Sequence, residues 1–121
     1  MSNNPKPILI VDDSPDIRES IKLIAESNGH SILEAANGRE ALARIRSSKE
    51  APSMILLDLW MPEMNGLDFL DELESHGALS EIPVVVMTAD PSSVSGHESV
   101  RAVLNKPFKM DALLRTFRAI L

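Results

Sequence analysis

Short, unbroken runs of apolar residues recur along this chain, and they limit its fold more than any other sequence feature. Each run holds about four residues, too few for a buried helix but suited to a strand covered on both faces. The runs occupy residues 8–11, 54–57, 84–87 and 102–104, with a weaker one at 32–35. Strands of this kind are typical of parallel sheets, in which helical crossovers join successive strands.

Segments with helical spacing separate the apolar runs. The first begins after Ser14, a capping residue followed by proline, and ends at the Asn-Gly pair at 28–29. Two more begin near Asn37 and Asn65, and the last carries a clear apolar stripe over 110–121. This alternation predicts an α/β fold with a doubly wound, five-stranded parallel sheet between helices.

Residues 90–100, with the sequence DPSSVSGHESV, interrupt this regularity. The segment contains a proline, a glycine and four serines, so its helix propensity is low. No apolar stripe can be drawn along it. Between the fourth and fifth strands we therefore expect a short or mobile fourth helix.

The length of 121 residues suits one domain over residues 1–121, with 1–6 as a polar N-terminal tail. Cysteine is absent, which excludes disulfides, and no apolar run approaches the roughly 20 residues of a membrane span. A soluble, cytoplasmic protein without membrane insertion is expected. The formal net charge of −6 and the lack of a basic stripe argue against direct nucleic-acid binding.

Charged and polar side chains follow four of the predicted strands. Asp12 and Asp13 follow the first strand, Asp58 the third, Thr88 the fourth and Lys106 the fifth. In a doubly wound sheet these strand ends share one edge, where ligands bind. Three neighbouring carboxylates repel one another unless a cation neutralises them, and Mg²⁺ prefers such oxygen ligands. The pattern predicts a Mg²⁺ site, with the hydroxyl and the ammonium group placed to stabilise a phosphoryl group.

A simpler explanation is available for each of these residues alone. Acidic residues often follow strands merely because loops are polar. A salt bridge between Lys106 and a neighbouring aspartate would also neutralise part of the cluster without any chemistry. The joint placement at four strand ends favours a functional site over these explanations.

Four motifs occur in the order ILIVDDSPDIR, ILLDLWMPEMNGLDFL, VVVMTA and LNKPF. In these motifs, from about Pro7 to Leu121, the chain resembles the receiver domain of two-component response regulators. The resemblance implies a flavodoxin-like sheet of strand order 2-1-3-4-5. It also implies a signalling phosphoacceptor that catalyses only its own phosphorylation and dephosphorylation. The phosphoryl donor would be a histidine kinase or a histidine phosphotransfer protein, and the output would reach an unknown downstream protein.

The resemblance assigns the phosphoacceptor and the metal ligands to single residues. Asp58 would be the nucleophile that takes the phosphoryl group and holds it as an acyl phosphate. Asp13 and Asp58 would bind Mg²⁺ directly together with the backbone carbonyl of Trp60. Asp12 would act on the metal mostly through water.

The resemblance also assigns the groups around the phosphoryl oxygens. Thr88 would turn its hydroxyl onto these oxygens after modification, and Lys106 would pair with the same group. The Lys106–Pro107 bond would be cis, which helps to aim the ammonium into the site. Gly66 fits a tight turn into the third helix.

Two departures from the family pattern concern the read-out of phosphorylation. The position three residues before the lysine, usually aromatic, is Val103, and the spacing from Thr88 to Lys106 is about one helical turn shorter than usual. Both changes lie in the region that many receivers use for output. We therefore expect phosphorylation to change order in residues 90–101 instead of rotating a buried aromatic side chain.

Trp60 and Asp90 lie two residues after the phosphoacceptor and the threonine, at positions that flank the phosphoryl group in this family. A bulky Trp60 would shield the acyl phosphate and slow its hydrolysis, whereas Asp90 would orient or repel the attacking water. The alternative is that Trp60 is simply an exposed aromatic residue on a loop.

Other functions compete with this interpretation. Phosphatases on related sheets need a second aspartate where this chain has Trp60, and a flavodoxin-like cofactor binder needs a phosphate cradle that the sequence DDSPD does not offer. A receiver-like binding module that works without phosphorylation stays open. So does a receiver taken from a longer regulator or hybrid kinase.

Overall fold

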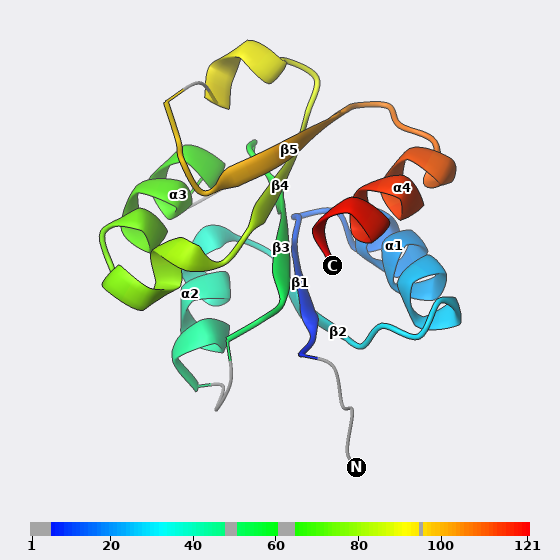
Figure 1. Cartoon of the computed structure of the whole chain (residues 1–121), viewed down its shortest axis with the longest axis horizontal. Helices are drawn as coiled ribbons and strands as arrows, with labels where there is room; N and C mark the ends of the chain where they lie inside the picture. Colours follow the sequence, from blue (N-terminus) through cyan, green and yellow to red (C-terminus); the bar gives the residue numbers. More distant parts are fainter. Residues whose placement is uncertain (1–5, 48–50, 61–64, 95) are drawn as a thin grey trace.

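The computed structural model describes residues 6–47, 51–60, 65–94 and 96–121. A five-stranded parallel sheet forms in the predicted order β2-β1-β3-β4-β5. Its strands are β1 (Ile8–Val11), β2 (Ile32–Ala35), β3 (Met54–Asp58), β4 (Val84–Thr88) and β5 (Val100–Asn105). The α-helices are α1 (Pro15–Ser27), α2 (Gly38–Ser47), α3 (Gly66–Glu74) and α4 (Met110–Ile120). Helices α1 and α4 cover one face of the sheet, and α2 and α3 cover the other (Figure 1).

The side chains of the strands alternate between two hydrophobic cores. Ile8 and Ile10 pack on the side of α1 and α4, whereas Leu9 and Val11 pack on the side of α2 and α3. Every residue of β1, β3 and β4 is buried. The runs at 8–11, 54–57 and 84–87 are therefore strands covered on both faces, which confirms the prediction for these three. The prediction of burial on both faces is wrong for β2 and β5, which are edge strands and largely half-buried.

The helices begin where the capping residues predict. Ser14, Asn37 and Asn65 each accept a hydrogen bond, through the side chain, from the backbone N–H three residues further along. These bonds satisfy donors that have no partner inside the first helical turn. Among the described helices, none is both long and apolar enough to cross a membrane.

The segment between β4 and β5 contains a short 3₁₀ helix, η2 (Pro91–Val94), and another 3₁₀ helix, η1 (Gly77–Glu81), precedes β4. The expectation of a short fourth helix is therefore confirmed, and its mobility stays a prediction. Val94 packs into the core beneath α2 and α3, and Val103 lies half-buried against the same core.

Polar contacts attach the chain after η2 to α3. The Glu74 carboxylate accepts hydrogen bonds from the backbone N–H and the hydroxyl of buried Ser99 and lies 3.0 Å from Nδ1 of His97. Burial raises the pKa of Glu74, but the bonds from Ser99 and His97 outweigh this and leave its pKa below the ordinary value. Asp71 stands near the same imidazole. The contacts of Glu74 with Ser99 and His97 hold the start of β5 without a long helix before it.

Strand β5 forms one edge of the sheet and is longer than predicted. Val84 pairs with Val100, but Val85 pairs with Ala102, so Arg101 is an extra residue on β5. Such a bulge bends an edge strand and increases its twist. The predicted strand of residues 102–104 is therefore the regular part of β5 after the bulge.

Candidate functional site

The carboxyl ends of the strands bring the predicted site residues to one edge of the sheet. Asp12 follows β1, Asp58 ends β3, Thr88 ends β4, and Lys106 follows β5. The backbone N–H of Lys106 donates to the carbonyl of Thr88 over 2.8 Å, which fixes the end of β5 beside that of β4. The parallel register therefore places these groups side by side, as the sequence predicts.

Lys106 lies between two buried aspartates. Its Nζ is 3.5 Å from Oδ2 of Asp12 and 3.4 Å from Oδ1 of Asp58, which are 1% and 5% exposed. The salt bridge of the simpler explanation is thus present, to both carboxylates. Asp13 adds a third carboxylate, and ligand oxygens of the three aspartates lie within 4.8 Å of one another. One ammonium group is too little charge to neutralise three carboxylates.

The charge on Asp58 is unfavourable in the folded protein. Burial and then the negative charge of Asp12 raise the pKa of Asp58, while Lys106 and a hydrogen bond from the Trp60 backbone lower it to a lesser extent. That bond joins the Trp60 N–H to Oδ1 of Asp58 over 3.2 Å. The net result is a raised pKa, which a bound cation would reverse.

The donor set fits Mg²⁺. Three carboxylates supply hard oxygen ligands, their spacing allows two or more to reach one ion, and their summed charge exceeds that of Lys106. Trp60 lies at the same edge through its bond to Asp58. The carbonyl of Trp60 as a third ligand stays a prediction.

Thr88 is 1% exposed, and its Oγ1 accepts a hydrogen bond from the N–H of Asp90 over 3.1 Å. The hydroxyl is thus engaged with the β4–η2 loop in this state, and its turn toward a phosphoryl group stays a prediction. Trp60 is 62% exposed, so it lies largely in solvent beside the site. Its predicted shielding of an acyl phosphate is likewise still to be tested.

Two predictions about the backbone near the site can be compared with the structure. The Lys106–Pro107 bond is cis, as the resemblance implies. Gly66 lies tightly against the strand end, since its N–H donates to the Leu59 carbonyl over 2.9 Å. A Cβ at Gly66 would lie 2.6 Å from the Cα of Leu59 and 2.8 Å from the carbonyl oxygen of Asp58. Residues 1–5 of the predicted tail and 61–64 of the second motif lie outside the described residues.

Arg18 and Glu34 belong to the surroundings of the site, and sequence reasoning did not assign them a role. Arg18 donates to the backbone carbonyl of Asp12 over 2.6 Å and to Glu34 over 3.1 Å. Lys22 also approaches Glu34, at 3.8 Å. The only signal for Arg18 in the sequence is its place in the first motif. Its partner Glu34 on β2 is sixteen residues away, so the local pattern does not reveal the contact. Arg18 fixes the loop that carries Asp12 and Asp13.

The comparisons with known proteins agree with this geometry. The family model of the response regulator receiver domain matches residues 8–118. Protein PilH of Pseudomonas aeruginosa is 36% identical over 118 residues, covering 94% of this chain and 96% of PilH. Response regulator MprA of Mycolicibacterium vanbaalenii is 38% identical over 97% of this chain, which spans about half (51%) of MprA.

A solved structure gives the same result for the fold. Response regulator TrrA of Thermotoga maritima, determined in complex with Mg²⁺-BeF, superposes with a TM-score of 0.82 at 30% identity. The match covers 96% of this chain and 99% of TrrA. Family match, sequence identity and sheet topology agree over almost all of the chain. The chain therefore belongs to the family of response regulator receiver domains.

Proposed function

We propose that Asp58 accepts a phosphoryl group from a phosphohistidine in a Mg²⁺-dependent reaction. The donor is a histidine kinase or a histidine phosphotransfer protein, and a downstream protein reads the phosphorylated state. The observation that carries this proposal is the meeting of Asp58 with Asp12, Asp13 and Lys106 at one sheet edge. The MprA comparison covers only half of that protein, so the proposal concerns the receiver function alone.

In the proposed step, a carboxylate oxygen of Asp58 attacks phosphorus while the bond from phosphorus to the donor imidazole nitrogen breaks. The bonding electrons stay on that nitrogen, which takes up a proton. Asp13, Asp58 and the Trp60 carbonyl would hold Mg²⁺, with Asp12 acting through water. Bound Mg²⁺ neutralises charge on the phosphoryl oxygens. Lys106 and Thr88 would supply a second positive charge and a hydrogen bond to the same oxygens.

A cavity beside the site supports a protein donor. It has a volume of about 550 Å³ and lies between α1 and residues 106–110. Its lining is largely apolar and includes Ile17, Ile21 and Phe108, and it reaches Lys106. An apolar surface next to the reactive carboxylate suits a donor that presents its histidine from a folded surface.

The chain contains one tryptophan, Trp60, whose fluorescence reports on the site. Mg²⁺ titration should change this fluorescence, and a small acyl phosphate should then add one phosphoryl group, detected by intact mass. Chelation of Mg²⁺ or the Asp58→Asn change should prevent the addition. Phosphorylation that persists in Asp58→Asn would show that another residue is the acceptor and would defeat the proposal.

Lys106→Met is expected to slow phosphorylation by about 100-fold, because it removes the cation that faces the phosphoryl oxygens. The rate is measured with a small acyl phosphate at saturating Mg²⁺. Lys109→Met removes an exposed charge nearby and serves as the matched control. Equal rates in both variants would exclude a role for the Lys106 ammonium.

Arg18→Met is expected to weaken Mg²⁺ binding about tenfold, because the loop carrying Asp12 and Asp13 loses its anchor. The dissociation constant comes from Trp60 fluorescence. Lys22→Met removes the other cation beside Glu34 but leaves the bond from Arg18 to Asp12 in place. A similar loss in both variants would mean that charge, and not the loop anchor, controls the metal.

For the read-out, we propose that phosphorylation changes order in residues 90–101. The short η2 helix and the contacts from Glu74 to Ser99 and His97 mark this segment as the connection between the strand ends and α3. Amide hydrogen exchange with and without a phosphoryl mimic should differ there and remain unchanged in α2. Identical protection across 90–101 would refute this read-out.

A further inference from the structure

A second group of metal-binding side chains lies at the amino ends of β4 and β5, away from the candidate phosphorylation site at the carboxyl ends of the strands. It consists of Asp71, Glu74 and His97, and one ligand atom of each lies within 4.8 Å of the other two. Asp71 and Glu74 are three residues apart on α3 and therefore share one face of that helix. His97 precedes β5. We name these three residues the α3–β5 cluster.

Hydrogen bonds hold the Glu74 carboxylate in one orientation. Its Oε2 accepts bonds from the backbone N–H and the hydroxyl of Ser99, which is fully enclosed by the fold. Its Oε1 lies 3.0 Å from Nδ1 of His97. Because Ser99 engages one oxygen, the other stays directed toward the imidazole. Outer contacts of this kind orient the carboxylate ligands of metal sites.

The backbone around His97 is also fixed. The N–H of Val100 donates to the His97 carbonyl over 3.2 Å, and the N–H of Val84 donates to the Ser99 carbonyl over 2.9 Å. These bonds tie the segment to the starts of β4 and β5. The ligand atoms on His97 and Glu74 are therefore positioned before an ion arrives, which lowers the entropy lost on binding.

Asp71 supplies a carboxylate that the fold does not use. Its side chain lies on an exposed position of α3. Within the described part of the chain, neither a hydrogen bond nor an ion pair engages this carboxylate. Its oxygens are therefore available to a ligand without the loss of an existing contact.

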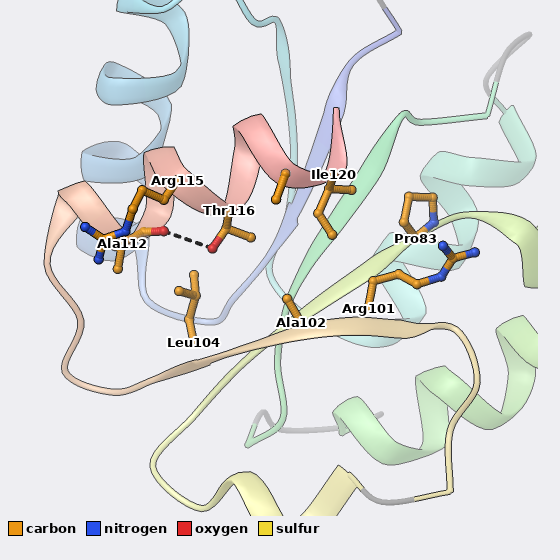
Figure 2. Close-up of a pocket in the computed structure, with 9 residues that line it drawn as sticks. Pro83, Arg101, Ala102, Leu104, Ala112, Arg115, Thr116 and Ile120 are labelled. Carbon is orange, nitrogen blue, oxygen red and sulfur yellow. Dashed lines mark hydrogen bonds between the residues drawn. The ribbon is translucent and has the colours of Figure 1, made fainter.

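Negative charge predominates around the α3–β5 cluster. Glu81 and Glu98 line, together with Glu74, a cavity of about 490 Å³ beside it. Arg101 lines this cavity too, and Figure 2 shows its side chain extending from β5 toward Pro83. No described carboxylate lies within 4.0 Å of the Arg101 guanidinium group. One arginine does not neutralise these carboxylates, so the region attracts a divalent cation.

We propose that the α3–β5 cluster binds a divalent transition-metal ion such as Zn²⁺. Nδ1 of His97 and one carboxylate oxygen each of Asp71 and Glu74 would be the protein ligands, and water would complete the coordination. An imidazole nitrogen suits Zn²⁺, whereas Mg²⁺ prefers oxygen ligands alone. The two metal sites of the molecule should therefore differ in the ion they prefer. This inference does not depend on the phosphorylation of Asp58.

The probe is Zn²⁺ itself, titrated into the unphosphorylated, ¹⁵N-labelled chain in excess Mg²⁺, which is expected to occupy the aspartates at the opposite edge of the sheet. We expect saturable amide shift changes in residues 71–76 and 96–100 that Mg²⁺ alone does not cause. Trp60 fluorescence reports separately on Zn²⁺ that reaches Asp58. Shift changes confined to the surroundings of Asp58, or no saturable change in the two segments, would overturn the proposal.

Three single variants complete the test. Asp71→Asn and His97→Gln should each weaken Zn²⁺ binding by about tenfold or more, because each removes a ligand. Asp71→Asn removes no contact of the fold, so its effect cannot come from misfolding. His76→Gln is the matched control and should leave the affinity unchanged.

His76 suits this purpose because it also pairs with a glutamate of α3, Glu72, over 3.4 Å. The His76–Glu72 pair is more exposed than the His97–Glu74 pair and has no third ligand among the described residues. Spectra of the metal-free variants show whether each keeps the fold. Unchanged affinity in Asp71→Asn, or equal weakening in His76→Gln and His97→Gln, would contradict the assigned ligands.

Discussion

Asp58→Asn is expected to abolish phosphorylation and, at the same time, to make the metal-free protein more stable by about 1 kcal/mol at pH 7. The wild-type carboxylate is buried beside Asp12, and this environment opposes its ionisation more than Lys106 favours it. An uncharged amide of the same shape removes this repulsion. The free energy of unfolding is measured by urea denaturation in the presence of a chelator.

The pH dependence gives the same prediction an independent check. Because the pKa of Asp58 is higher in the folded than in the unfolded state, the folded state binds the proton more tightly. The free energy of unfolding should therefore fall as pH rises from near 3.8 through the raised pKa. In Asp58→Asn, the free energy of unfolding should lack this pH-dependent fall. The control Asp71→Asn, at an exposed position, should retain it.

Mg²⁺ should reverse the order of stability. The ion binds the folded wild type and raises its free energy of unfolding by mass action. The Asp58→Asn variant lacks a proposed ligand, so Mg²⁺ should raise its free energy of unfolding by less. If wild type and Asp58→Asn respond equally to Mg²⁺, Asp58 is not a metal ligand. If the metal-free variant is less stable than wild type, the carboxylate is favourable in the fold, contrary to our interpretation.

Gly66→Ala is expected to destabilise the protein by about 3 kcal/mol and to weaken Mg²⁺ binding. Its Cβ would fall 2.6 Å from the Leu59 Cα and 2.8 Å from the Asp58 carbonyl, and backbone atoms cannot move aside as a flexible side chain does. Any relief displaces the end of β3, which carries Asp58, the proposed phosphoacceptor.

The control for this variant is Asp71→Ala, an exposed position in the same helix, which should change stability by less than about 0.5 kcal/mol. Urea denaturation gives the free energy of unfolding, and Trp60 fluorescence gives the Mg²⁺ affinity. A Gly66→Ala protein as stable as wild type would mean that α3 can shift without moving β3.

Local patterns predicted the sheet well. Runs such as Ile8 to Val11 are buried on both faces. The N-cap of α1 at Ser14 could be predicted because a serine followed by proline is a common helix start. The site could also be predicted in outline, because parallel strands bring their carboxyl ends to one edge. Asp58 and Lys106 meet there as expected, although nearly fifty residues separate them.

Contacts between distant segments were not predictable in the same way. Nothing in the local pattern around Arg18 indicates that it bonds both the Asp12 carbonyl and Glu34. The contacts of Glu74 with Ser99 and His97 depend equally on how α3 packs beside the chain entering β5. The start of β5 was missed because a bulge at Arg101 disturbs the alternation on which strand prediction depends.

That bulge has a consequence for how chain length can vary in this protein. Val100 and Val103 face the core beneath α2 and α3, whereas Ala102 faces the core beneath α1 and α4. Removing Arg101 would leave these three residues in strict alternation, so each side chain would keep its present core. A deletion of one residue here would also leave Lys106 in register with Thr88. Strand β5 thus contains one position where the chain can shorten without moving the proposed phosphorylation site.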